Sequence, residues 1–169
     1  GIRVFQAPNE MSRLLDQINH RRRKPLFVKL PPYTSSDGSS PPDNNDRDNV
    51  LDLVRTCVNN NVEAFTVANT WPTKESSLAI GRGGVSGKLV YPKMIKMVTE
   101  IKSEIGNKAI INASGGIFTG ADAWDALQAG ASTVQILTGL IYRGPSIVKR
   151  INQELLHIMD CEGLPSLDT

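Results

Sequence analysis

The sequence has few cysteines, little net charge and no long apolar run. Only two of its 169 residues are cysteines, Cys57 and Cys161, and neither has a CxxC partner. We therefore expect neither a disulfide framework nor a zinc site. The formal net charge of +2 gives no case for binding nucleic acid. Cys57 lies in an apolar helical pattern and is predicted to pack in the core, whereas Cys161 is predicted to lie in a polar tail.

No apolar stretch approaches the roughly 18 residues that a membrane helix needs, and the start has no signal-peptide pattern. We expect an intracellular, soluble protein. The length suits one domain with a sizeable core. The first residue is Gly1 rather than methionine, and the opening segment reads like the middle of a protein. We therefore interpret the chain as a fragment or a processed product.

Apolar runs rich in β-branched residues alternate with helical patterns. The runs cover residues 26–30, 64–67, 109–111 and 133–137, and are typical of parallel strands covered on both faces. Apolar residues at a spacing near 3.6 predict helices over residues 11–18, 50–58, 94–101, 121–128 and 147–158.

This α-β-α alternation predicts an α/β fold with a parallel sheet, which both doubly wound sheets and (β/α)8 barrels contain. No GxGxxG follows the first strand, which weighs against the dinucleotide-binding type of doubly wound sheet. A whole barrel needs eight units in about 250 residues. The four units here therefore correspond to half of one, in a single domain over residues 1–169.

Two long loops follow predicted strand ends. The loop over residues 31–45 is rich in Ser, Pro, Asp and Asn, and is predicted to be mobile or partly disordered. The loop over residues 69–87 contains Gly81, Gly83, Gly84 and Gly87, so we expect it to bend sharply or to approach another group closely. Barrel enzymes keep their active sites at the end of the sheet where such loops lie.

Small polar turns follow the last two predicted strands. Ser114-Gly115-Gly116 comes after one strand, and Leu137-Thr138-Gly139 comes after the next. In barrels these two positions commonly build a phosphate site from bare backbone N–H groups. The alternative is that the glycines only allow a tight strand-to-helix turn. The pairing of the two turns favours the phosphate site.

Lys29 interrupts an apolar strand near its carboxyl end. Beside a flavin ring, its ammonium group would stabilise the negative charge of the reduced ring. A lysine whose stem packs at the barrel rim explains the residue equally well. Asn69 and Thr70 end the second strand, where an amide suits a planar polar substrate. A local turn or helix cap is the alternative there. His20 and His157 lie in helical stretches and are interpreted as surface residues.

Several motifs, taken together, resemble those of the dihydroorotate dehydrogenase family over nearly the whole chain. They are Phe-Val-Lys-Leu at residues 27–30, Ala-Asn-Thr at 68–70, Gly-Gly-Val-Ser-Gly at 83–87, Ala-Ser-Gly-Gly-Ile-Phe-Thr-Gly at 113–120 and the run at 128–135. The glycine-rich stretch and the segment from Gly1 to Gln6 look more like the quinone-linked class 2 enzymes. Residues 29–33 are similar to the soluble class 1 enzymes.

The resemblance implies the C-terminal half of a flavin-binding (β/α)8 barrel, strands five to eight. By similarity, Lys29 and Gly87 would contact FMN, and Gly115, Gly116, Leu137 and Thr138 would surround its phosphate. Asn69 and Thr70 would bind orotate or dihydroorotate. The catalytic base of the family would precede Gly1, so no catalytic residue is assigned within the chain.

The expected activity is FMN-dependent oxidation of dihydroorotate to orotate in pyrimidine biosynthesis, with a quinone as electron acceptor. The resemblance implies a cytoplasmic location or a peripheral one on the inner membrane, mitochondrial in a eukaryote. Two alternatives stay open: a related FMN barrel acting on another pyrimidine, and a non-catalytic half barrel that self-associates.

Overall fold

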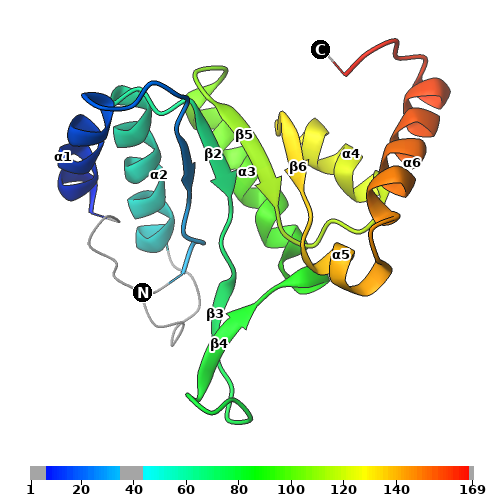
Figure 1. The fold of residues 1–169 in the computed structure, drawn as a ribbon, viewed down its shortest axis with the longest axis horizontal. Coiled ribbons are helices and arrows are strands. Elements are labelled where there is room, and N and C mark those ends of the chain that lie inside the picture. Colours follow the sequence, from blue (N-terminus) through cyan, green and yellow to red (C-terminus); the bar gives the residue numbers. More distant parts are fainter. Residues whose placement is uncertain (1–6, 35–43, 168–169) are drawn as a thin grey trace.

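A computed structural model describes residues 7–34 and 44–167 of the chain (Figure 1). The elements, in order, are α1 Pro8–Asn19, β1 Phe27–Lys29, α2 Asn44–Asn59, β2 Ala64–Val67, β3 Trp71–Lys74, β4 Arg82–Val85, the 3-10 helix η2 Gly87–Val90, α3 Tyr91–Ile105, β5 Ile110–Ser114, α4 Gly120–Gln128, β6 Thr133–Gln135, α5 Thr138–Arg143 and α6 Ile147–Glu162. Each helix predicted from apolar spacing is present. The segment 1–6 and most of the loop 31–45, with its predicted mobility, lie outside the described residues.

The main sheet has four parallel strands in the order β1-β2-β5-β6. Each strand therefore pairs with the strand of the next βα unit, which confirms the parallel sheet predicted from the alternation. All four carboxyl ends lie at one end of the sheet, together with the segments that follow them (Figure 1). The small polar turns predicted from the sequence, after β5 and after β6, therefore lie at this end of the sheet.

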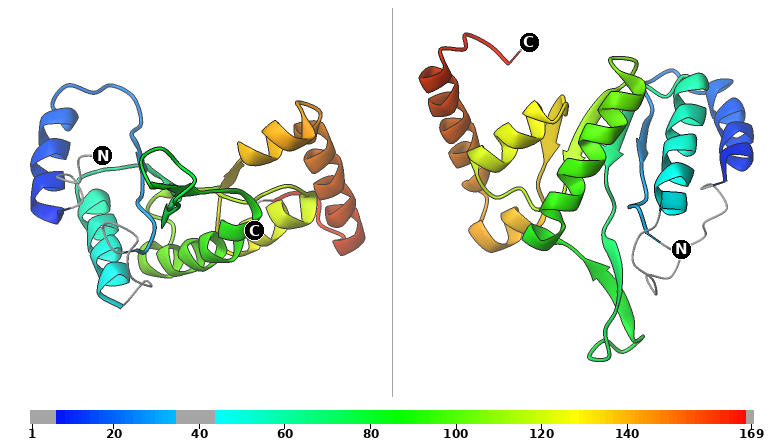
Figure 2. Two further views of the ribbon diagram at one scale, coloured as in Figure 1. Left: turned by 90° about the horizontal axis from the view of Figure 1, so that it is seen from below. Right: turned by 180° about the vertical axis from the view of Figure 1, so that it is seen from behind.

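The helices α1, α2, α3, α4 and α6 form an arc around the sheet, and leave its other face uncovered (Figure 2). Side chains on the helix-facing side are buried, among them Phe65, Val67 and Ile111. On the uncovered face, Phe27 and Ile110 keep 56% and 46% of their surface exposed. Alternate residues of a strand point to opposite faces, which accounts for this contrast. The curved sheet with helices outside has the layout of half a barrel.

The predicted loop over residues 69–87 is largely a β-hairpin, which corrects the sequence interpretation. Strands β3 and β4 pair antiparallel, in register from Trp71 with Val85 to Lys74 with Arg82, and project beyond the carboxyl end of the sheet (Figure 1). Pro72 and two glycines hid this hairpin, because such residues weaken a strand pattern. The close approach predicted there is real, since a β carbon on Gly84 would collide with the Thr70 hydroxyl.

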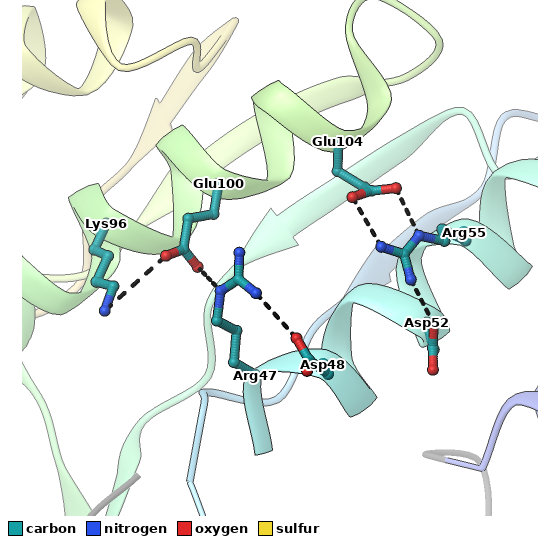
Figure 3. A network of polar contacts seen from close by, with 7 residues as sticks. All are labelled: Arg47, Asp48, Asp52, Arg55, Lys96, Glu100 and Glu104. Atoms are coloured by element: carbon teal, nitrogen blue, oxygen red, sulfur yellow. Dashed lines mark hydrogen bonds and ion pairs between the residues drawn. The ribbon is translucent and has the colours of Figure 1, made fainter. Parts of the chain in front are cut away.

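Helices α2 and α3 are joined by a row of ion pairs along their exposed sides (Figure 3). Arg47 Nε lies 3.0 Å from Glu100 Oε2, and Arg55 Nε lies 2.6 Å from Glu104 Oε1. Beneath them, apolar residues of both helices are fully buried, including Val54 and Met97. The pairs therefore guide the alignment of two helices that apolar burial holds together. None of the described helices is both long and apolar enough to span a membrane.

Candidate functional site

A pocket lies at the carboxyl end of the parallel sheet. Its lining contains every residue that the sequence singled out as a cofactor or substrate contact: Lys29, Asn69, Thr70, Gly87, Gly115, Gly116, Leu137 and Thr138. These residues come from four strand ends and from η2. Ser86, Ser114, Gln135 and Gly139 also line it. The parallel topology thus brings together positions that are up to 109 residues apart in sequence.

The turn after β5 presents bare backbone to this pocket. Gly115 and Gly116 have φ values of +142° and +73°, which favour glycine. A β carbon on Gly116 would lie 2.7 Å from the carbonyl oxygen of Gly87 and 2.7 Å from Tyr91 Cβ. Both glycine turns therefore pack against each other, and a larger residue at position 116 would push them apart.

A third turn, at the start of α5, meets the other two. Thr138 Oγ1 lies 3.3 Å from Ser86 Oγ, and a β carbon on Gly87 would lie 3.1 Å from Thr138 Cγ2. The predicted strand 133–137 in fact ends at Gln135, and Leu137 is the residue that precedes the short helix α5. The sequence interpretation missed this helix because six residues are too few to show a helical period.

Lys29 lies on the uncovered face of the sheet, exposed at the mouth of the pocket. In the strand register, Lys29 pairs with Thr66. Thr66 pairs with Asn112 on the next strand, and Asn112 pairs with Thr133 on the last. A polar row therefore crosses all four strands. Lys29 therefore faces the pocket rather than the helices.

Hydrogen bonds join three members of this row, and the sequence interpretation missed them. Asn112 Nδ2 donates to Thr66 Oγ1 at 3.3 Å, and Thr133 Oγ1 donates to Asn112 Oδ1 at 3.0 Å. Asn112 Nδ2 also lies 3.5 Å from Gln135 Oε1. The available signal was a polar residue within each otherwise apolar strand, which marks a position that differs from the buried ones beside it.

Asn69 and Thr70 are exposed at the end of β2. The backbone N–H of Asn69 donates to the carbonyl oxygen of Leu30 at 3.0 Å, which fixes the two strand ends together. Asn69 Oδ1 accepts from the backbone N–H of Thr70 at 2.9 Å. Part of the local hydrogen bonding considered from sequence is thus present, while both residues also line the pocket.

The remaining candidate groups lie away from the pocket. His20, the C-cap residue of α1, and His157, in α6, are both exposed, as predicted. Cys57 is buried in α2, where burial raises the pKa of its thiol to about 12, so the core assignment is confirmed. The polar-tail assignment of Cys161 is wrong, because α6 continues through it and places its Sγ 3.8 Å from His157 Nε2. Within residues 7–34 and 44–167, no group of three His, Cys, Asp or Glu is arranged to hold a metal ion.

Comparison with known proteins gives consistent relatives. The family model for dihydroorotate dehydrogenase matches residues 1–159. The dihydroorotate dehydrogenase (quinone) of Trichodesmium erythraeum (strain IMS101) is 34% identical over 180 residues, covering 99% of this chain and 45% of that protein. The enzyme of the same name from Halobacterium salinarum (strain R1) is 28% identical over 172 residues, covering 99% and 46%.

The crystal structure of the Eimeria tenella enzyme in complex with ferulenol matches the fold with a TM-score of 0.81, at 25% identity. The match covers 96% of this chain and 47% of that one. The chain thus spans about half the length of the relatives it matches, and the predicted half barrel is confirmed. The family model covers the strands, the glycine turns and the polar strand ends that form the pocket. By sequence and by fold, the chain belongs to the dihydroorotate dehydrogenase family.

Proposed function

We propose that this chain forms the FMN-binding half of an oxidoreductase that converts dihydroorotate to orotate in pyrimidine biosynthesis. The observation that carries the proposal is the meeting of three turns, at Gly87, Gly115-Gly116 and Thr138, beside Lys29 at one pocket. Similarity to the quinone-named relatives supports a quinone as the electron acceptor. That acceptor is lipid-soluble, which suits a peripheral position on a membrane for the whole enzyme.

The pocket fits a phosphate-bearing cofactor on physical grounds. Backbone N–H groups at glycines bind anions because no side chain blocks their approach. A β carbon at position 116 would meet Gly87 O and Tyr91, so glycine lets the two turns lie together at the pocket, and Thr138 adds a hydroxyl group. Gly115, Gly116, Leu137 and Thr138 would hold the phosphate of FMN, and Gly87 would flank it.

FMN, when bound, supplies the two-electron acceptor that substrate oxidation requires. Lys29 would lie beside the ring and favour negative charge on it. Asn69 and Thr70 would hydrogen-bond the planar substrate, since an amide offers both donors and an acceptor. We place the general base that removes the substrate proton outside residues 1–169.

The test uses the longest natural protein that contains this chain, called the full-length protein below. We expect it to purify with bound FMN, seen by flavin absorbance, and to form orotate from dihydroorotate with a soluble quinone. Dihydrouracil serves as the comparison substrate. Oxidation of dihydrouracil without oxidation of dihydroorotate would point to a related pyrimidine oxidoreductase. Absence of flavin together with absence of orotate formation would contradict the proposal.

A further inference from the structure

Two of the turns at the pocket come from segments that no strand pairing connects. Gly87 begins η2, and Gly115-Gly116 follow β5. They lie against each other, as the 2.7 Å from a β carbon on Gly116 to Gly87 O shows. Val90 and Tyr91 also pack on the two glycines, because β carbons at positions 115 and 116 would meet them at 3.2 Å and 2.7 Å. Polar contacts just beyond the turns add to this packing.

Asp122, in the first turn of α4, contacts both segments. Its Oδ1 is paired with the Nζ of Lys88, the residue after Gly87. Its Oδ2 accepts from the backbone N–H of Phe118 at 2.9 Å and of Thr119 at 3.2 Å. Asp122 is only 8% exposed, and is one of two buried residues with a polar or charged side chain in the described part of the chain. One buried carboxylate thus connects η2 to the end of the glycine turn.

Tyr91 holds the same connection from the other side. The Lys88 ammonium lies 4.2 Å from the centre of the Tyr91 ring, a cation–π distance. The Tyr91 hydroxyl lies 3.1 Å from the Asp122 carbonyl oxygen and 3.1 Å from Asp125 Oδ2. Lys88 is therefore oriented by a carboxylate and a ring at once, although part of its side chain is exposed.

The Asp122 carboxylate is stabilised in its ionised form. Burial alone would favour the neutral acid, but the bonds from Lys88 and from the Phe118 backbone outweigh it, and the pKa of Asp122 lies below its usual value. A charged acceptor makes stronger hydrogen bonds than a neutral one. The charge therefore strengthens every link that this residue makes.

A helix cap explains only part of these contacts. Asp122 and Thr119 form a reciprocal capping box at the start of α4. Such a box requires contacts between these two residues alone. The ion pair to Lys88 and the bond from Phe118 N–H lie outside it, and they connect elements on either side of the pocket.

We propose that Asp122, through Lys88 and the Phe118 backbone, is a positioning residue that sets the spacing of the Gly87 and Gly115-Gly116 turns. The inference rests on the proposed function insofar as those turns receive FMN. Breaking either link would let the turns separate, without removing any group that touches the cofactor.

The experiment compares Asp122→Asn, Lys88→Met and the double variant of the full-length protein, with Asp52→Asn as control. Asp52 is also an ion-paired aspartate on a helix, but its partner is Arg55 of the same helix and neither residue lines the pocket. The dissociation constant of FMN from stripped protein is measured well below Tm. Hydrogen exchange by mass spectrometry follows the segments 86–91 and 114–119.

Each single variant should weaken FMN binding about tenfold, since a charge-assisted link is lost in either case. The double variant should bind FMN at most about twofold more weakly than either single variant, because both substitutions remove the same contact. Lys88→Met should speed exchange in segment 114–119, and Asp122→Asn should speed it in segment 86–91. Lys88→Arg, which keeps the charge, should retain FMN binding, and Asp52→Asn should change neither readout.

The cross-segment exchange distinguishes positioning from capping. If Lys88→Met leaves both segment 114–119 and FMN affinity unchanged, Asp122 acts only as a cap, and the positioning role is wrong while the proposed function stands. If the unmodified full-length protein binds no FMN, the proposed function fails. Hydrogen exchange alone then tests the positioning role of Asp122. Faster exchange in segment 114–119 of Lys88→Met and in segment 86–91 of Asp122→Asn supports it, and unchanged exchange overturns it.

Discussion

Gly116 combines a left-handed backbone with a lack of space for any side chain. Its φ is +73°, and a β carbon would approach Gly87 O to 2.7 Å. Gly106, at the end of α3, has a φ of +58° with nothing within 4 Å of the same added atom. The two positions therefore share the cost of a positive φ, about 1 kcal/mol for a non-glycine residue. They differ in what the new methyl group would displace.

We predict that Gly116→Ala in the full-length protein lowers FMN affinity by at least about tenfold, because the Gly87 turn must move. Gly106→Ala should lower Tm less than Gly116→Ala, because only the positive φ opposes it, and should leave the FMN dissociation constant unchanged. Fluorescence titration of flavin into stripped protein measures the affinity of both variants, and thermal unfolding measures their Tm. Equal affinity in the two variants would contradict a phosphate site at this turn.

Among the described residues that line the pocket, Lys29 is the one with a cationic side chain. Lys29→Met keeps the length of the stem and removes the charge. We predict a lower flavin reduction potential and slower flavin reduction by dihydroorotate, because the reduced ring loses its counter-charge. Spectroelectrochemical titration gives the potential. Lys74→Met, at the end of β3 and outside the pocket lining, is the control and should leave the potential unchanged.

At the scale of the elements, the pairing of α2 with α3 carries a pH dependence. The hydrogen bonds from Arg55 hold the pKa of Glu104 below its usual value. A carboxylate whose pKa is lower in the folded state contributes stability above its unfolded pKa, near 4.5. That contribution is lost as the pH falls through the lower pKa of the folded protein.

We predict that Glu104→Gln lowers Tm by about 1–2 °C at pH 7, as expected for a partly exposed ion pair. The difference from the unmodified protein should shrink as the pH falls below about 4.5, where Glu104 becomes protonated in both states. Thermal unfolding followed by circular dichroism measures it. Glu162→Gln, at a carboxylate without an ion pair in the described part of the chain, should show no such difference. A constant difference down to pH 3 would argue against this linkage.

The hairpin shows how element prediction failed where local signals conflict. Pro72, Gly83 and Gly84 together are typical of a loop, yet they lie in paired strands. The four core strands carry no such conflict, because each is a run of apolar residues bounded by turns. The helix α5 was missed for a different reason, since it is too short to show a repeat.

At the scale of the whole molecule, the described residues leave one face of the sheet uncovered and both of its edges open. Among them, strands β1 and β6 each pair on one side only. Phe27 and Ile110 are exposed on the uncovered face, and Ile141 and Tyr142 of α5 are 70% and 79% exposed. Open strand edges and apolar surface favour association. We propose that the other half of the barrel covers this face in the full-length protein.

We predict that the 169-residue chain alone does not oxidise dihydroorotate, since the proposed base lies outside it and such a base typically contributes about 10²–10⁴-fold. The chain should self-associate, which sedimentation velocity would show as a concentration-dependent rise in mass. Mixing with a separately expressed upstream half should restore activity with a dye acceptor and suppress self-association. Turnover by the chain alone would show that the placement of the base is wrong.

The sequence by itself determined the parallel strands, the helices between them and the family, because apolar period and glycine-rich motifs are local properties. It also marked eight of the residues that line the pocket, since turns and polar residues that follow parallel strands share one end of the sheet. Only the tertiary structure decided which segments touch across that edge. The contacts of Asp122 with Lys88, and of Asn112 with Thr133, join residues 34 and 21 positions apart. Such pairings depend on how the sheet curves and the turns pack, which no local pattern records.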